Sequence, residues 1–134
     1  MARVPALLAL LLALTALAGC TFSQGSIPGG YGQQGAVNER DHFQYGLQGT
    51  KSGQEGHTWQ MTGSVAVVRW GAQGSGSLTV TISDADGKQV FKGTFSGGQS
   101  GGEQRTSPGR AGAWTIHLAF RDFNGQGGLE VVKA

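Results

Sequence analysis

Short runs in which apolar and polar residues alternate, separated by glycine, make up most of the chain from about Asp41 onward. The clearest run is Gly76–Ser83, where leucine, valine and isoleucine alternate with threonine and serine. A period of two places one set of side chains on each face of a β-strand. The sequence Asp-Ala-Asp-Gly at 84–87 predicts a tight turn, because Asp and Gly tolerate the backbone angles of hairpins. Lys88–Phe95 is the expected partner strand.

The same pattern predicts further strands on both sides of this hairpin, and Arg110–Arg121 is the strongest of them. The others are expected at Phe43–Gln48, His57–Met61, Ser64–Trp70, Ser100–Thr106 and Leu129–Lys133, with a turn at Gly125–Gly128. No segment of this region has a helical period. Seven or eight short strands with glycine-rich turns predict an all-β fold, a small antiparallel β-sandwich or jelly roll.

The apolar faces of these strands define the expected core. It comprises Trp59, Met61, Val65, Val67, Leu78, Val80, Ile82, Phe95, Trp114, Ile116, Leu118, Phe120, Leu129 and Val131. Glycine, at 25 of 134 residues, is far above its usual share of about 7%. Because glycine inside a strand costs about 0.5–1 kcal/mol relative to alanine, we expect most glycines in turns and bulges.

Residues 1–19 have the features of an export leader. Arg3 supplies a positive charge, and Ala6–Ala18 is an unbroken run of alanine and leucine with one threonine. The run falls within the roughly 7–15 residues of a signal peptide. It is too short for a membrane-spanning helix, which needs about 20 apolar residues.

The apolar run ends in Leu17-Ala18-Gly19-Cys20, which resembles the lipobox of bacterial lipoproteins at all four positions. The resemblance implies cleavage between Gly19 and Cys20, with acylation of the Cys20 thiol and usually of the new amino terminus. Cys20 is the only cysteine, and an anchor explains a lone thiol in an exported protein. If the envelope is Gram-negative, Thr21 favours the outer membrane, where an Asp would favour the inner one. An ordinary cleaved leader is the alternative.

Residues 20–40 are rich in Gly, Gln and Ser and show neither strand nor helix periodicity. We expect this segment to be a flexible tether with a reach of roughly 25 Å. The globular domain is expected at 41–134. Ten Lys and Arg against eight Asp and Glu leave the chain almost neutral, which excludes the clustered basic face of a nucleic-acid-binding protein.

Three candidate chemistries are outweighed by simpler interpretations. Gly98-Gln99-Ser100-Gly101-Gly102 has the spacing of a hydrolase nucleophile elbow, but no helix follows the serine as that motif requires. Asp84 and Asp86 have the spacing that begins a calcium-binding loop, yet the twelfth position is Phe95 instead of Glu. A hairpin turn is therefore favoured, and a calcium site is the alternative. The histidines, His42, His57 and His117, have no second ligand at a metal-binding spacing. We predict no metal site, no cofactor and no enzyme.

Trp70 ends an expected strand beside Arg69 and before a glycine-rich stretch. An exposed indole beside polar groups can stack on a ligand such as a sugar ring. Trp70 and Arg69 are therefore the candidate ligand contacts, and packing at the rim of the core is the alternative.

The stretch Leu78–Val132 contains a strand, an Asp-x-Asp-Gly turn, a strand, a Gly-x-Trp strand and a final hairpin. In this order it resembles the pre-peptidase C-terminal and GOLD β-sandwich modules, which generally bind or accompany other molecules. We expect a lipid-anchored protein of the cell envelope whose domain binds a glycan or an envelope protein without catalysis. The alternatives are an envelope hydrolase that pairs Ser100 with a histidine, and an accessory subunit of an envelope complex.

Overall fold

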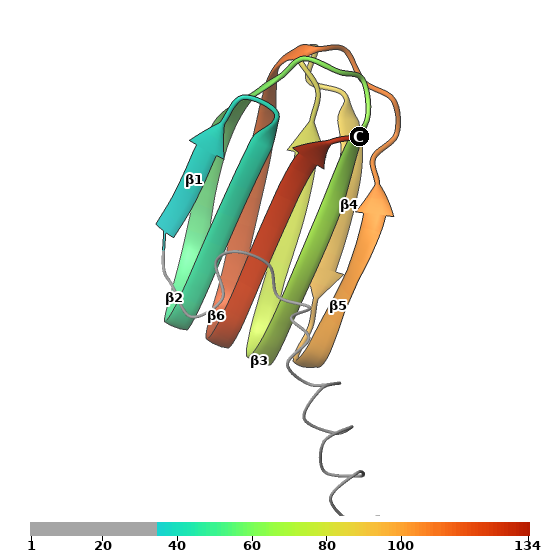
Figure 1. The fold of residues 1–134 in the computed structure, drawn as a ribbon. Coiled ribbons are helices and arrows are strands. Elements are labelled where there is room, and N and C mark those ends of the chain that lie inside the picture. The colour runs from blue at the N-terminus through green and yellow to red at the C-terminus, as the bar shows by residue number, and fades with distance from the viewer. Residues whose placement is uncertain (1–34) are drawn as a thin grey trace, which may run out of the picture.

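The computed structural model describes residues 35–134, so the predicted leader, Cys20 and most of the predicted tether lie outside the described residues. The described chain is all-β and antiparallel (Figure 1). Its strands are β1 (Gly35–Glu39), β2 (His42–Met61), β3 (Ala66–Ser83), β4 (Gln89–Phe95), β5 (Gly98–Arg105) and β6 (Gly112–Lys133). Within residues 35–134 we find no helix with the length and apolar character needed to cross a membrane.

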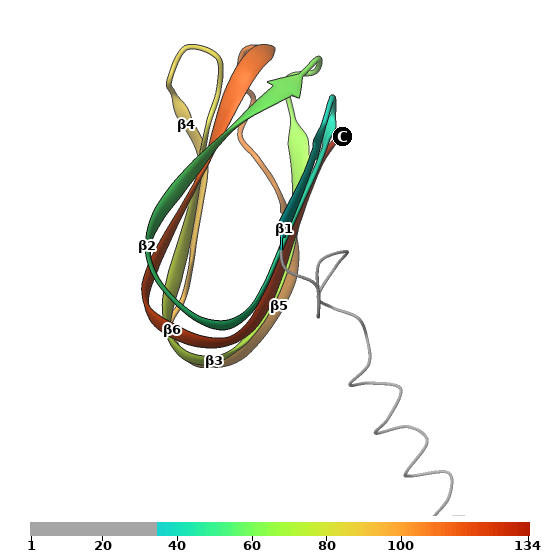
Figure 2. The same cartoon turned by 90° about the vertical axis from the view of Figure 1, so that its left-hand side faces the viewer.

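One sheet folds over on itself to make both layers of the molecule. Neighbouring strands follow the order β1-β2-β6-β3-β4, and β5 pairs with the other end of β3. Figure 2 shows β2, β3 and β6 bending so that the two halves of each long strand lie in opposite layers. Layer A contains β1, β5 and residues 42–51, 66–75 and 123–133; layer B contains β4 and residues 53–61, 77–83 and 112–121. The chain is an antiparallel β-sandwich, which confirms the predicted fold class.

The bend depends on glycine, because the strands approach one another there too closely for side chains. Register shifts interrupt the pairing of β2 and β3 with β6 at this level of the sheet. A Cβ atom on Gly74 would lie 2.2 Å from the carbonyl oxygen of Asn124, and one on Gly125 would lie 2.0 Å from that of Gln73. Glycine bulges of this kind let a sheet turn a corner.

Each predicted strand overlaps a strand of the structure, and the hairpin turn at 84–87 is confirmed. The prediction of a turn at Gly125–Gly128 is wrong, because these residues continue β6 and pair with both β2 and β3. β1 lies within the range assigned to the tether. The expected short strands are thus joined into three long ones, because the glycines between them pair across the sheet. Five glycines even form one row across layer A: Gly35, Gly46, Gly128, Gly71 and Gly101.

The core fills the space between the layers and confirms most of the predicted side chains. Buried as predicted are Trp59, Met61, Val80, Ile82, Phe95, Trp114, Ile116, Leu118, Phe120, Leu129 and Val131. Leu78 packs against this core while only partly buried. The prediction for Val65 and Val67 is wrong, because Ala66 and Val68 are buried and the strand has the opposite phase. The core also holds side chains that were not predicted, including Phe43, Tyr45, Leu47, Phe91 and Phe123.

Candidate functional site

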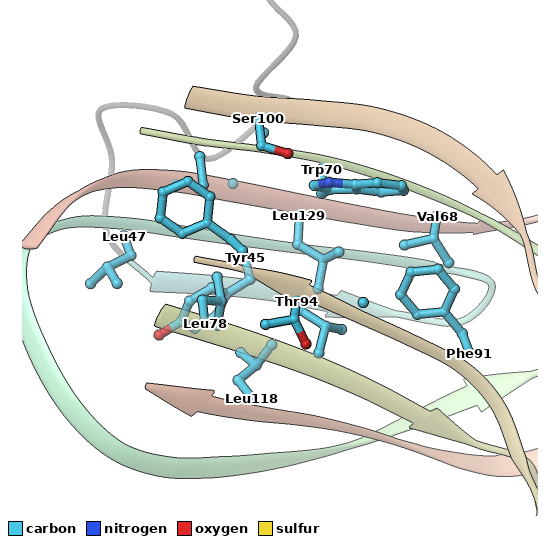
Figure 3. A pocket seen from close by; sticks show the side chains of 17 residues that line it. Tyr45, Leu47, Val68, Trp70, Leu78, Phe91, Thr94, Ser100, Leu118 and Leu129 are labelled. Carbon is cyan, nitrogen blue, oxygen red and sulfur yellow. The ribbon is translucent and has the colours of Figure 1, made fainter. Parts of the chain in front are cut away.

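An apolar pocket lies between the two layers, on the side of the sandwich where β4 and β5 form the edges (Figure 3). Its volume is about 110 Å³. The rings of Trp70 and Phe91 form part of its wall, with centroids 6.0 Å apart and planes inclined at 56°. Aliphatic side chains complete most of the lining: Leu47, Val68, Leu78, Val80, Leu118 and Leu129.

The two candidate contact residues, Trp70 and Arg69, lie on opposite faces of layer A. Successive side chains of a strand point to opposite faces, and β3 directs Trp70 inward, where its indole lies against Gly102 of β5. Arg69 is on the outer face, where its Nη1 lies 3.3 Å from Oε1 of Glu130. A ligand in the apolar pocket therefore meets Trp70 without meeting Arg69.

A polar cleft of about 270 Å³ lies on the opposite side of the sandwich, where β1 and β2 meet the bend. Its lining comprises Gly35, Ala36, Tyr45, Gly46, Leu47, Lys51, Glu55 and His57. The bend of β2 turns Glu55 back toward Tyr45, ten residues earlier, whose hydroxyl donates to Oε2 of Glu55 at 2.8 Å. The sequence pattern does not predict this cleft, because alternation along one strand does not show which residues meet across a bend.

Glu55 is the centre of this cleft. Its Oε2 also forms an ion pair with Nζ of Lys51, and its Oε1 lies 3.1 Å from Nε2 of His57. Burial opposes ionisation of Glu55, but hydrogen bonds from Lys51, Tyr45 and His57 outweigh it and hold its pKa below the ordinary value. Burial and the neighbouring Glu55 raise the pKa of Tyr45, so the phenol keeps its proton. The cleft thus combines an ionised acceptor with several donors.

The apolar pocket and the polar cleft share a wall. Tyr45 and Leu47 line both of them, although the two sites are on different sides of the sandwich. Tyr45 turns its ring toward the apolar interior and its hydroxyl toward Glu55. Its amphipathic side chain therefore separates the two environments.

Ser100 lies on β5 and lines the apolar pocket, on a strand and not on the strand-to-helix turn that a nucleophile elbow needs (Figure 3). The histidines have contacts elsewhere: His42 with Glu130, His57 with Glu55 and His117 with Gln54. The fold therefore does not bring any of them to Ser100. In residues 35–134 we find no group of three or more His, Cys, Asp or Glu side chains placed to hold a metal ion.

The Asp84 carboxylate serves the hairpin turn. Its Oδ1 accepts the backbone N–H groups of Asp86 and Lys88, each at 2.9 Å, and its Oδ2 accepts that of Arg110 at 2.9 Å. The hydrogen bond from Arg110, followed by those from Lys88 and Asp86, lowers the pKa of Asp84 against the effect of burial. Both oxygens are thus engaged by the backbone.

Comparison with known proteins gives fold-level similarity only. No protein-family model and no curated protein matches the chain. The solved structures with similar folds include TmCBM61 in complex with β-1,4-galactotriose, at 15% identity and a TM-score of 0.46 over 69% of this chain and 70% of that one. A carbohydrate-binding module of Cellvibrio mixtus lichenase 5A in complex with cellotriose is 11% identical, with a TM-score of 0.42 over 81% and 92% of the two chains. A Bacillus licheniformis lipase in propeptide form is 17% identical, with a TM-score of 0.46, over 76% of this chain and 24% of that one.

Proposed function

We propose that this chain is a non-catalytic glycan-binding domain of the cell envelope, held at a membrane by a lipid on Cys20. The polar cleft beside Tyr45 is the observation that carries the glycan part of the proposal. The leader and the lipobox-like sequence ending in Cys20 support the anchor.

The chemistry of the cleft matches a sugar. Sugar hydroxyls both donate and accept hydrogen bonds, and here the Glu55 carboxylate has further lone pairs to accept them while the Lys51 ammonium has further N–H groups to donate. Tyr45, Leu47 and Ala36 give the same cleft apolar surface, against which the C–H face of a sugar ring can pack. A few fixed polar groups beside apolar surface are the usual composition of a small-molecule site.

The size and place of the cleft indicate how the glycan would bind. A volume of about 270 Å³ is near the lower end of the roughly 300–1,000 Å³ of small-molecule sites. The cleft therefore suits one sugar unit or a chain end, and not a long polysaccharide segment. Gly35, the first residue of β1, lines it, so the site lies on the side of the domain that the tether enters.

Binding should be tested with the full chain in native gels that contain soluble β-glucan, galactan or xylan, and by pull-down with peptidoglycan sacculi. We expect retention by at least one of these glycans. A hydrogen bond to a charged group contributes about 1.5–3 kcal/mol, so Glu55→Gln should weaken retention by about tenfold or more. Lys51→Met should also weaken it.

Lys92→Met is the matched control, because Lys92 is exposed on β4, away from the cleft. It should bind as the unmodified chain does, and circular dichroism should show that all three variants keep the β fold. Failure of every glycan to retain the unmodified chain, or unchanged retention of Glu55→Gln, would refute the glycan proposal.

A further inference from the structure

The apolar pocket has a chemistry that the proposed glycan site does not use. Three hydroxyl side chains line it, those of Tyr45, Thr94 and Ser100. The Tyr45 hydroxyl donates a hydrogen bond to Glu55 on the other side of the sandwich. The Thr94 hydroxyl shares a hydrogen bond with that of Thr79, with the two Oγ1 atoms 3.3 Å apart. Ser100, on the edge strand β5, is therefore the hydroxyl that the pocket can present near its mouth.

A sugar would be a poor occupant of this pocket. Burying a hydroxyl without a hydrogen bond costs about 1–3 kcal/mol by protein mutational data, and a sugar ring would carry several hydroxyls into a lining made mostly of carbon. An empty apolar cavity of comparable size stays dry and accepts small apolar molecules. The pocket therefore selects for an apolar group.

The shape of the pocket wall favours a flexible chain over a flat ring as the ligand. The planes of Trp70 and Phe91 are inclined at 56°, so these rings do not form the parallel walls that would hold an aromatic ring by stacking. The other walls are aliphatic side chains and glycine backbone. A flexible chain can follow such a surface.

The mouth of the pocket lies between strands that do not pair with each other. β4 pairs with β3 in layer B, and β5 pairs with β3 in layer A. On each of these edge strands a glycine lies beside an aromatic ring and adds no side chain next to it. A Cβ atom on Gly93 would lie 3.1 Å from Phe91, and one on Gly102 would lie 3.0 Å from Trp70. A chain can enter here without breaking a hydrogen bond between the two layers.

We propose that the apolar pocket binds the end of an unbranched alkyl chain, with the polar end of that molecule at the mouth beside Ser100. This site is separate from the polar cleft and does not depend on the proposed glycan function. Its volume of about 110 Å³ limits the bound portion to a few carbon atoms.

The experiment is a titration of straight-chain alcohols, from propanol to octanol, followed by calorimetry. It uses the full chain with Cys20→Ala, so that no acyl group on the protein competes. Each methylene that enters the pocket contributes about 0.8 kcal/mol, so affinity should rise about fourfold per carbon. The rise should stop once the pocket is full.

Gly127→Val is the variant that fills the pocket from its wall. Gly127 lines the pocket, and a Cβ atom there would make ordinary contacts, the nearest at 3.6 Å from the carbonyl oxygen of Gly71. Gly56→Val is the matched control, because a Cβ atom there meets open space. We expect Gly127→Val to lose at least tenfold in alcohol affinity, while Gly56→Val keeps it.

Three results would overturn the alkyl site. One is an absence of alcohol binding by the Cys20→Ala chain. The others are equal binding by Gly127→Val and a rise with chain length that has no plateau, since both would indicate general partitioning onto the protein. Glycan retention by Gly127→Val should be unchanged, which separates the fate of this proposal from that of the polar cleft.

Discussion

Asp84 shows how much local structure one side chain can determine. Its carboxylate joins the β3–β4 turn to Arg110, just before β6, through three backbone N–H groups. The residue itself is buried, with 5% of its surface exposed. The side chain therefore holds together two segments that are 26 residues apart in the sequence.

We expect Asp84→Asn to lower the melting temperature at pH 7 by about 5 °C or more, because an amide nitrogen cannot accept an N–H group. A carboxylate whose pKa is lowered in the folded state stabilises the protein above its unfolded pKa of about 4. That stabilisation is lost as the pH falls through the folded pKa of Asp84, which lies lower still. The gap between the two melting curves should therefore close in acid.

Asp86→Asn is the control for this measurement. Asp86 is exposed, and its carboxylate lies 3.6 Å from Nη1 of Arg110, an exposed ion pair of the kind that contributes little. Its melting temperature should change by no more than about 2 °C at any pH. A constant gap between Asp84→Asn and the unmodified chain down to pH 2 would contradict the assigned role of the carboxylate.

The sequence could not show on which face of the strand each candidate contact residue lies. Trp70 and Arg69 were predicted together as ligand contacts, and the structure places Trp70 partly buried against the core, as in the alternative of packing at its rim. Without the phase of the strand, the sequence could not show that the two side chains lie on opposite faces. Alternation put Val67 on the inner face, and the structure puts Ala66 and Val68 there. A run of consecutive apolar residues, small and large, does not show which of them face the core. The sequence therefore could not decide which face of the strand Trp70 occupies.

At the level of elements, glycine determines whether strands can pass the bend. Gly125 has no left-handed backbone angle, but a Cβ atom on it would lie 2.0 Å from the carbonyl oxygen of Gln73. We expect Gly125→Ala to lower the free energy of unfolding by about 3 kcal/mol, since a contact of this kind forces the backbone apart. Urea denaturation followed by circular dichroism would measure it.

Gly56→Ala separates this contact from the general effect of glycine in a strand. Gly56 is in β2, where a Cβ atom meets nothing within 4 Å. Replacement there should be neutral or stabilise the chain by about 0.5–1 kcal/mol. Equal effects of the two replacements would mean that close approach at the bend is not what Gly125 provides.

The same glycines limited the prediction of elements. Alternation located segments of β2, β3, β4 and β6, because burial of one face leaves a pattern that does not depend on what lies beyond the ends of the strand. It could not tell a turn from a bend within a strand, since Gly125–Gly128 satisfies both. The sequence also contains no sign that β1 continues the sheet, because all five of its residues are exposed and show no burial pattern.

For the whole molecule, the anchor is the part of the proposal that a single measurement can decide. Protein recovered from membranes should have an intact mass equal to residues 20–134 plus acyl chains. Two or three acyl chains, at about 0.8 kcal/mol per buried methylene, hold a protein firmly. The same protein with Cys20→Ala should lack the acyl mass and leave the membrane fraction.

A soluble chain without added mass would contradict the anchor and leave the β-sandwich itself unaffected. The glycan and alkyl sites would then have to be sought on a secreted protein. An acylated chain recovered from membranes would direct both searches to molecules found at the envelope.

The position of β6 also decides when the molecule can fold. It is the last strand in the sequence, yet it lies between β2 and β3, which do not pair with each other. Before residues 112–133 are present, the chain can form only separate strand pairs around β2 and β3, which are marginal in water. Folding that waits for such distant pairings is slow. If the chain crosses a membrane behind a leader, as we propose, this delay would keep the polypeptide unfolded until residues 112–133 have followed.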